Sequence, residues 1–175
     1  MNTTRYYKSA LAVFLFIISL AARGEDAWAD AAVKGLVAMN SGDGGSFVKI
    51  THSDHKTIMR DLLISRIRAT PTSKDSIATL RDYGAASVAD LESIPMDVMI
   101  KKMIYFMHHS IPVPTRTALK DAKLVPVGSE PRDDLYRVLI NMTFVLDGKS
   151  AERRFVVLAK QEDGVWKYYG EEPRK

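Results

Sequence analysis

One stretch of alternating side chains constrains the fold of this chain more than any other feature of its sequence. Between residues 136 and 146 every even position is apolar, while the odd positions include Arg137, Asn141 and Thr143. Such period-two alternation is typical of a strand with one buried face. Asp147 and Gly148 follow directly, and both tolerate the positive φ that a two-residue hairpin turn requires. The chain is therefore expected to contain an antiparallel sheet.

The rest of this sheet is expected on both sides of the alternating stretch. Residues 153–161 are the predicted return strand, and Asp163-Gly164 predicts a second tight turn before a last strand at 165–169. Residues 115–127 are the expected first strand, kinked near Pro126 because proline cannot donate to a sheet ladder.

The first half of the chain predicts helices instead. Apolar residues recur there at three-to-four spacing, and glycine or proline ends each segment. In the helix expected at residues 53–68, the side predicted to be buried carries Ile58, Leu62, Leu63 and Ile67. Helices followed by strands indicate an α+β fold. We expect N-terminal helices packed on a curved C-terminal antiparallel sheet of about four strands, of the cystatin-like or cone type.

Residues 1–24 have the three parts of a secretory signal peptide: a basic start, an apolar run and small residues at the end. The apolar run is short for crossing a bilayer, which takes about 20 residues, so cleavage is favoured over the alternative of an uncleaved N-terminal anchor. Ala22 and Gly24 suit cleavage before Glu25, and a second match would place the cut after Ala29. The sequence therefore predicts a periplasmic or secreted protein without a stable membrane span after cleavage.

Removal of residues 1–24 leaves residues 25–175, which are expected to form a single domain. The full chain has 25 Lys+Arg and 21 Asp+Glu, a net charge of +4. Three of the bases lie in residues 1–24, so the remainder has 22 bases and 21 acids, a net charge of +1. Nucleic-acid binding usually needs a strong basic patch, so no nucleic-acid partner is expected. The absence of cysteine excludes a thiol nucleophile, a thiolate metal site and disulfides.

Several segments resemble the nuclear transport factor 2-like superfamily, which includes SnoaL-like and ketosteroid-isomerase-like proteins. Residues 31–43 resemble the opening helix of that family and its end, and residues 88–109 resemble the helical middle of exported members. Residues 138–148, 155–160 and 162–167 resemble the closing strands, with Trp166 just after an acid-glycine turn. The resemblance implies a cone-shaped sheet around a pocket closed by helices. It carries over no catalytic residue, because no motif fixes which Asp or Tyr faces inward.

Two groups of side chains are candidate site residues. Aromatic residues on the expected strands could line a ligand pocket or form the ordinary core between sheet and helices, namely Tyr136, Phe144, Phe155, Trp166 and Tyr168. Four histidines are candidate metal ligands, namely His52, His55, His108 and His109. They show no recognised ligand spacing, and a helix C-terminus favours histidine in any case. We therefore expect no bound metal and no cofactor.

Three functions remain open on the sequence alone. The preferred hypothesis is a non-enzymatic exported binding module for a small apolar ligand or a partner protein. The second is a small isomerase, dehydratase or hydrolase that uses a buried Asp with Tyr or His. The third is an envelope-associated structural protein that forms a homodimer through its sheet.

Overall fold

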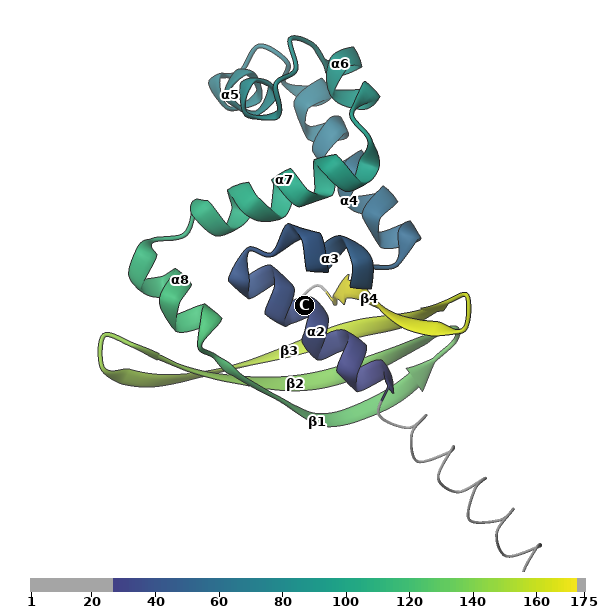
Figure 1. The fold of residues 1–175 in the computed structure, drawn as a ribbon, viewed down its shortest axis with the longest axis vertical. Coiled ribbons are helices and arrows are strands. Elements are labelled where there is room, and N and C mark those ends of the chain that lie inside the picture. Colours follow the sequence, from purple (N-terminus) through teal and green to yellow (C-terminus); the bar gives the residue numbers. More distant parts are fainter. Residues whose placement is uncertain (1–26, 173–175) are drawn as a thin grey trace, which may run out of the picture.

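The computed structural model describes residues 27–172, so the expected signal peptide, residues 1–24, lies outside the described residues. Helices occupy the first part of this region and a four-stranded sheet occupies the last part (Figure 1). The α+β fold expected from the sequence is confirmed.

The sheet is an antiparallel meander in which each strand pairs with the next along the chain. Its order is β1-β2-β3-β4, with β1 (Lys123–Arg132), β2 (Leu135–Leu146), β3 (Lys149–Glu162) and β4 (Val165–Glu171). Asp147 and Gly148 have φ of 51° and 74° between β2 and β3, and Asp163 and Gly164 have φ of 52° and 77° between β3 and β4. Both tight turns expected from the sequence are therefore present.

The start of the sheet is different from the expectation of a strand at residues 115–127. That segment first forms a helix, α8 (Val113–Lys120), and β1 begins only at Lys123. Pro112 directly precedes the first residue of α8, and Pro114 is its second residue. In the first turn of a helix the missing N–H of proline costs nothing, and its fixed φ suits the helix. The prolines therefore start a new helix here, whereas the sequence pattern predicts only that proline ends the preceding one.

The inner face of the sheet is covered by α2 (Ala27–Ser41) and α3 (Gly44–Ile50), which lie across the strands (Figure 1). Val138, Ile140 and Val157 of the sheet are completely buried in this layer, and Leu36 of α2 is 2% exposed. The alternation seen in the sequence thus marks the face of β2 that forms the core.

A second apolar cluster lies farther from the sheet, among α4 (Ser53–Ala69), α5 (Lys74–Tyr83), α6 (Val88–Ser93) and α7 (Met96–His109). Helix α7 belongs to both clusters, because Ile100 and Ile104 pack with the sheet-side core while Met99 packs with the second cluster.

The expected buried side of α4 is wrong for two of its four residues. Ile58 and Leu62 are 43% and 66% exposed, whereas Ile64 and Ile67 are buried. Because α4 is covered where α6, α7 and β4 lie against it, its buried face is set by those neighbours rather than by its apolar residues alone.

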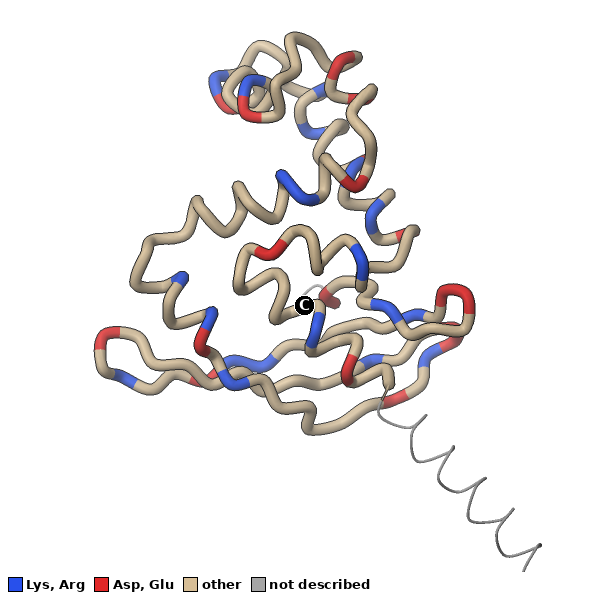
Figure 2. Tube along the Cα trace, viewed as in Figure 1, with Lys and Arg blue, Asp and Glu red and all other residues tan. Residues whose placement is uncertain are grey.

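The outer face of the sheet is not covered by any helix in the described part of the chain (Figure 1). Leu139 and Val156 are half-buried there and line a shallow hollow of about 380 Å³ together with Gly128 and Arg137. Basic and acidic residues are interspersed along the described strands and helices in Figure 2.

Candidate functional site

The inner face of the sheet is filled by the protein's own side chains. Tyr168 is 2% exposed, and its ring packs edge-on against Phe47 of α3 at 5.5 Å between centroids. Gly35 of α2 lies so close to this ring that a Cβ there would be 2.1 Å from Tyr168 Cδ2. Phe155 also packs against this core. These two expected pocket residues therefore contact core side chains.

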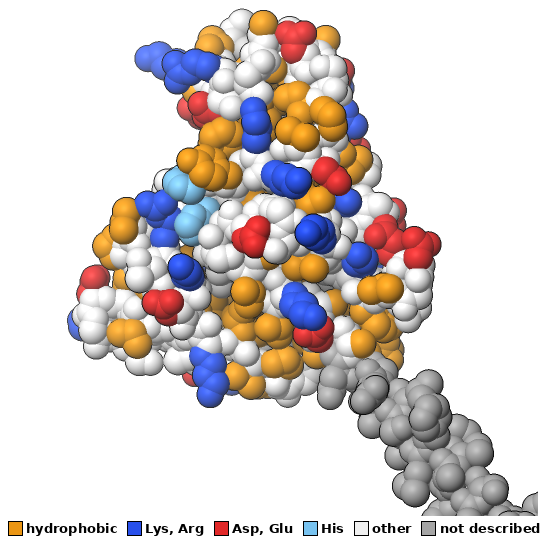
Figure 3. Space-filling model, in the orientation of Figure 1, with side chains coloured by type: hydrophobic (Ala, Val, Ile, Leu, Met, Phe, Trp, Pro, Cys, Tyr) orange, Lys and Arg blue, Asp and Glu red, His pale blue; other side chains and the backbone are white. Residues whose placement is uncertain are grey.

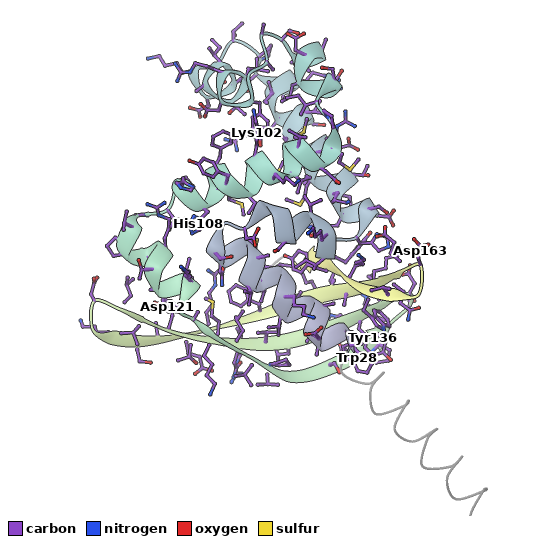
Figure 4. The ribbon with its side chains drawn as sticks, viewed as in Figure 1. Trp28, Lys102, His108, Asp121, Tyr136 and Asp163 are labelled. Atoms are coloured by element: carbon purple, nitrogen blue, oxygen red, sulfur yellow. The ribbon has the colours of Figure 1, made fainter. Side chains whose placement is uncertain are left out.

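Two further aromatic candidates form a cluster at one end of α2 (Figure 4). Trp28 stacks on Tyr136 with 4.3 Å between ring centroids, and Trp166 meets Tyr136 edge-on at 5.2 Å. Tyr136 and Trp166 were expected on the sheet, but no sequence pattern identified Trp28 as their partner. The three rings tie the beginning of α2 to β2 and β4.

Tyr136 and Trp166 border a hollow of about 260 Å³, and Phe144 borders a larger open space. This space is a groove of about 640 Å³ between α8 and the far end of β2. Pro114, Thr117, Ala118 and Asp121 line it from α8 and its C-terminal end. The opposite wall is formed by β2 and its neighbours, namely Lys123, Thr143, Phe144, Val145, Leu146 and Asp147.

The groove runs along a strand edge that the sheet leaves unpaired. Strand β1 begins at Lys123, which pairs with Thr143. The remaining residues of β2, 144–146, pair with β3 on one side and with no described strand on the other. In an antiparallel strand alternate residues direct N–H and C=O to each side, so this edge presents free backbone groups toward the groove.

The other edges of the sheet carry features that hinder pairing with another chain. Strand β1 has Pro126 and Pro131 and a register shift between Pro126 and Gly128, and both prolines and bulges protect edge strands. Along β4, Thr51 forms a parallel bridge with Tyr168, and the amide of His52 donates to the Tyr168 carbonyl. The far part of β3 is rich in charge, with Lys149, Glu152, Arg153 and Arg154. Residues 144–146, by contrast, contain no proline, no bulge and no charged side chain, and no described strand pairs with their free edge.

The groove combines apolar and charged groups. Phe144 and Leu146 are half-buried and lie on the inner face of β2, whereas Val145 points to the outer face and is 60% exposed. Ala118 is 8% exposed and leaves room on the α8 side because of its small side chain. Asp121 and Lys123 supply one charge of each sign near the start of β1. Such a groove suits an extended chain that has apolar side chains and free backbone groups.

The first histidine candidate, His52, has a structural role. It is 6% exposed, and its Nε2 lies 3.2 Å from the Gln161 carbonyl while its Nδ1 accepts from the Asp54 amide at 3.1 Å. Since Nε2 must donate to a carbonyl and Nδ1 must accept from an amide, the ring carries its proton on Nε2. His52 therefore joins the start of α4 to β3.

His55 lies beside it, between the rings of Tyr168 and Tyr169. Burial, with a smaller contribution from His52, lowers the pKa of His55 below its usual range. Lys160 contacts Asp54 at 3.0 Å and Asp134 at 3.1 Å. Hydrogen bonds to these two carboxylates raise the pKa of Lys160, so it remains a cation and cannot act as a nucleophile or base near neutral pH.

His108 and His109 lie at the C-terminal end of α7, on the other side of the molecule from the start of α4 (Figures 1 and 4). The structure therefore brings the four histidines together in two separate pairs. Within residues 27–172, no group of three or more His, Cys, Asp or Glu residues is placed to hold a metal ion.

Most of the groove was not predicted from the sequence. Thr117, Ala118 and Asp121 fall in the segment expected to be a strand, so they were not considered as one face of a helix. The signal that could have identified them is the pair Pro112 and Pro114 followed by residues that favour a helix. The unpaired edge of β2 follows from the late start of β1, which no local pattern specifies.

Comparison with known protein families, with curated proteins and with solved structures finds no match to this chain. No helix within residues 27–172 is long and apolar enough to span a membrane.

Proposed function

We propose that the protein is an exported, non-enzymatic binding module that holds a short extended segment of a partner protein in the groove between α8 and the unpaired end of β2. The observation that carries this proposal is the free backbone edge of residues 144–146 beside an open groove. Addition of a strand to an exposed sheet edge is a general mode of peptide recognition. Three residues of edge, at about 3.3 Å each, match a segment of three or four residues.

The filled interior of the fold supports a site on the outside. The inner face of the sheet holds Leu36, Phe47 and Tyr168, each no more than 2% exposed. A ligand of ordinary size needs a pocket of about 300–1,000 Å³, and side chains of α2 and α3 already occupy this layer. The groove beside α8 falls within that range and is open to solvent. An internal pocket for the small apolar ligand of the sequence hypothesis is therefore disfavoured, and the unpaired backbone beside the groove favours an extended segment as its occupant.

Export is part of the proposal and rests on the sequence of residues 1–24. The fold gives a reason to favour cleavage before Glu25. Helix α2 begins at Ala27, and Trp28 stacks on Tyr136. A cut after Ala29 would remove the first three residues of α2, including Trp28 and the ring that stacks on Tyr136. Membership of the nuclear transport factor 2-like superfamily remains part of the same proposal, supported by the resemblance of the closing strands and the curved sheet beneath helices.

The test begins with a library of phage-displayed heptapeptides selected against the purified protein. Selected peptides are expected to be apolar at alternate positions and to bind in an extended form. Two peptide variants are then compared, one with methyl groups on the backbone amides of its even positions and one with them on its odd positions. One variant should lose binding and the other should keep nearly the original affinity, because only one of the two sets of amides faces β2.

A matched pair of variants places the site on the molecule. Thr117→Trp puts a large ring into the groove and should reduce peptide affinity at least tenfold. Val113→Trp adds the same side chain to α8 at a residue that is 62% exposed and does not line the groove, and it should bind as the original protein does. Equal binding by both variants would refute this site. A retained small molecule in native mass spectrometry, lost on Thr117→Trp, would favour the small-ligand alternative.

A further inference from the structure

Three side chains that carry hydrogen-bond donors gather where α7 turns into α8. His108 lies in the last turn of α7, while Arg116 and Lys120 lie one turn apart on the same side of α8. Arg116 and Lys120 also act electrostatically on His108, in agreement with this arrangement. Figure 3 shows histidine side chains next to basic side chains on this part of the surface, and Figure 4 labels His108 at the end of α7.

Arg116 is half-buried and has no acceptor for its side chain in the described part of the chain. Its Nε is buried without a hydrogen-bond partner, and none of its guanidinium nitrogens forms an ion pair with a described residue. Two other buried side-chain nitrogens in residues 27–172 share this property: His108 Nδ1, in the same group, and Arg60 Nε. Arg60 differs because its guanidinium still donates to the Glu92 carbonyl. Buried donors nearly always have partners, so Arg116 lacks one that the described part of the chain does not supply.

The position of His108 fixes which of its nitrogens can donate. A Cβ on Gly42 would lie 2.7 Å from His108 Nδ1, so the ring rests directly against this glycine, whose φ is +71°. Nδ1 is buried there and has no acceptor. A proton on Nδ1 would remain unsatisfied, so the neutral ring carries its proton on Nε2. Burial, followed by the nearby His109, Arg116 and Lys120, lowers the pKa of His108 and keeps the ring neutral.

No described carboxylate neutralises this group. Asp43, in the connection between α2 and α3, accepts instead from the amide and hydroxyl of Ser46. Asp121 lines the groove on the other face of α8 and forms no ion pair with Lys120 within residues 27–172. The helix dipole favours His108, His109 and Lys120, which are all in last turns. It does not account for Arg116, which lies in the middle of α8 with a buried, unpartnered Nε.

We propose that His108, Arg116 and Lys120 form a binding site for a phosphate-type oxyanion. Arg116 supplies a planar set of donors that matches phosphate oxygens, Lys120 supplies a second positive charge, and the Nε2–H of His108 supplies a neutral donor. The guanidinium, the ammonium and the Nε2–H all donate, so an anion satisfies them together and relieves the repulsion between Arg116 and Lys120. This site lies on a different face of α8 from the groove and does not depend on the function proposed for it.

The experiment measures binding of inorganic phosphate to the intact protein by calorimetry, with a ¹⁵N spectrum of the histidine rings. Phosphate is expected to bind and to shift the Nε2 signal of His108, and Arg116→Gln and Lys120→Gln should each weaken binding at least tenfold. Lys74→Gln removes an exposed cation on α5 and should have no effect. Because Lys120 is exposed, its variant should fold even if Arg116→Gln does not. Arg116→Lys should recover only part of the affinity, since it restores charge without the planar donors.

Two phosphate sources are compared in the same way. Glycerol 3-phosphate binding more tightly than inorganic phosphate would identify the natural ligand as an organic phosphate, while equal or weaker binding would identify the free ion, and either result supports an oxyanion site. The proposal is overturned if phosphate does not bind, or if Lys120→Gln and Lys74→Gln bind it equally. An unchanged His108 spectrum at saturating phosphate would also overturn it, because the anion would then lie elsewhere.

Discussion

Replacement of Gly35 by alanine should destabilise the protein through a single methyl group. A Cβ at this position would lie 2.1 Å from Cδ2, 2.4 Å from Cγ and 2.8 Å from Cβ of Tyr168. Ordinary carbon contacts are about 3.5–4.0 Å, so the ring or the helix would have to move by roughly 1.5 Å. The ring has little room, because Phe47 lies 5.5 Å from it and His55 lies 5.7 Å from it, measured between centroids.

The magnitude follows from two opposing effects. Overpacking of a core costs about 1–3 kcal/mol, and the upper end applies because the contacts involve the rigid base of a buried ring. Alanine is favoured over glycine within a helix by about 1 kcal/mol. The net loss in the free energy of unfolding should therefore be about 2 kcal/mol. Gly45→Ala is the matched control, since its Cβ would meet only Asp43 Oδ1 at 3.4 Å, and it should be neutral or stabilising by about 0.5 kcal/mol.

Urea denaturation followed by tryptophan fluorescence measures these differences. The same Gly35→Ala change is then made in a Tyr168→Gly background, where none of the three contacts exists. There it should be neutral or favourable, which gives a coupling of about 2 kcal/mol between the two positions. A Gly35→Ala protein as stable as the original would refute the close approach of α2 to β4. An equal loss in both backgrounds would refute Tyr168 as its cause.

Two further predictions concern pH and export. Because the pKa of His55 is lower in the folded protein, its neutral form stabilises the fold above the unfolded pKa of about 6.5, and this stability is lost as the pH falls below that value. Urea midpoints should therefore drop between pH 7.5 and 5, and His55→Gln should show a smaller drop; an equal drop would show that His55 does not contribute. For export, the intact mass of protein recovered from its own envelope should correspond to a first residue of Glu25, and a mass beginning at Asp30 or Met1 would contradict this.

The sequence predicted the two hairpins of the sheet correctly but not the point at which its first strand begins. The alternation in residues 136–146 and the turns at Asp147-Gly148 and Asp163-Gly164 are local signals, and each led to the correct hairpin. The boundary between α8 and β1 was wrong because a proline pair can end one helix or begin the next, and only packing on the sheet decides which. The exposed position of Ile58 and Leu62 had a similar cause, since the buried face of α4 depends on where α6 and α7 lie.

The candidate sites were harder to predict because they arise where elements meet. Phe144 was identified as an aromatic residue on a strand, but its place beside a groove depends on the point at which β1 begins. His108 was identified as a possible metal ligand, and its fixed ring results from contact with Gly42, which is 66 positions away in the sequence. No sequence pattern identifies Arg116 as a site residue, since one arginine in a short polar segment is common. Its unpartnered Nε becomes visible only with the fold.

The position of α7 between two apolar clusters has a consequence for how this sequence can change over time. Substitutions in α7 must suit two sets of neighbours at once, since Ile100 and Ile104 belong to one cluster and Met99 to the other. Helices α5 and α6 contact only the outer cluster and can open or vary without disturbing the sheet. Among relatives of this protein, we therefore expect α7 and the strands to remain similar while α5 and α6 differ in length and composition.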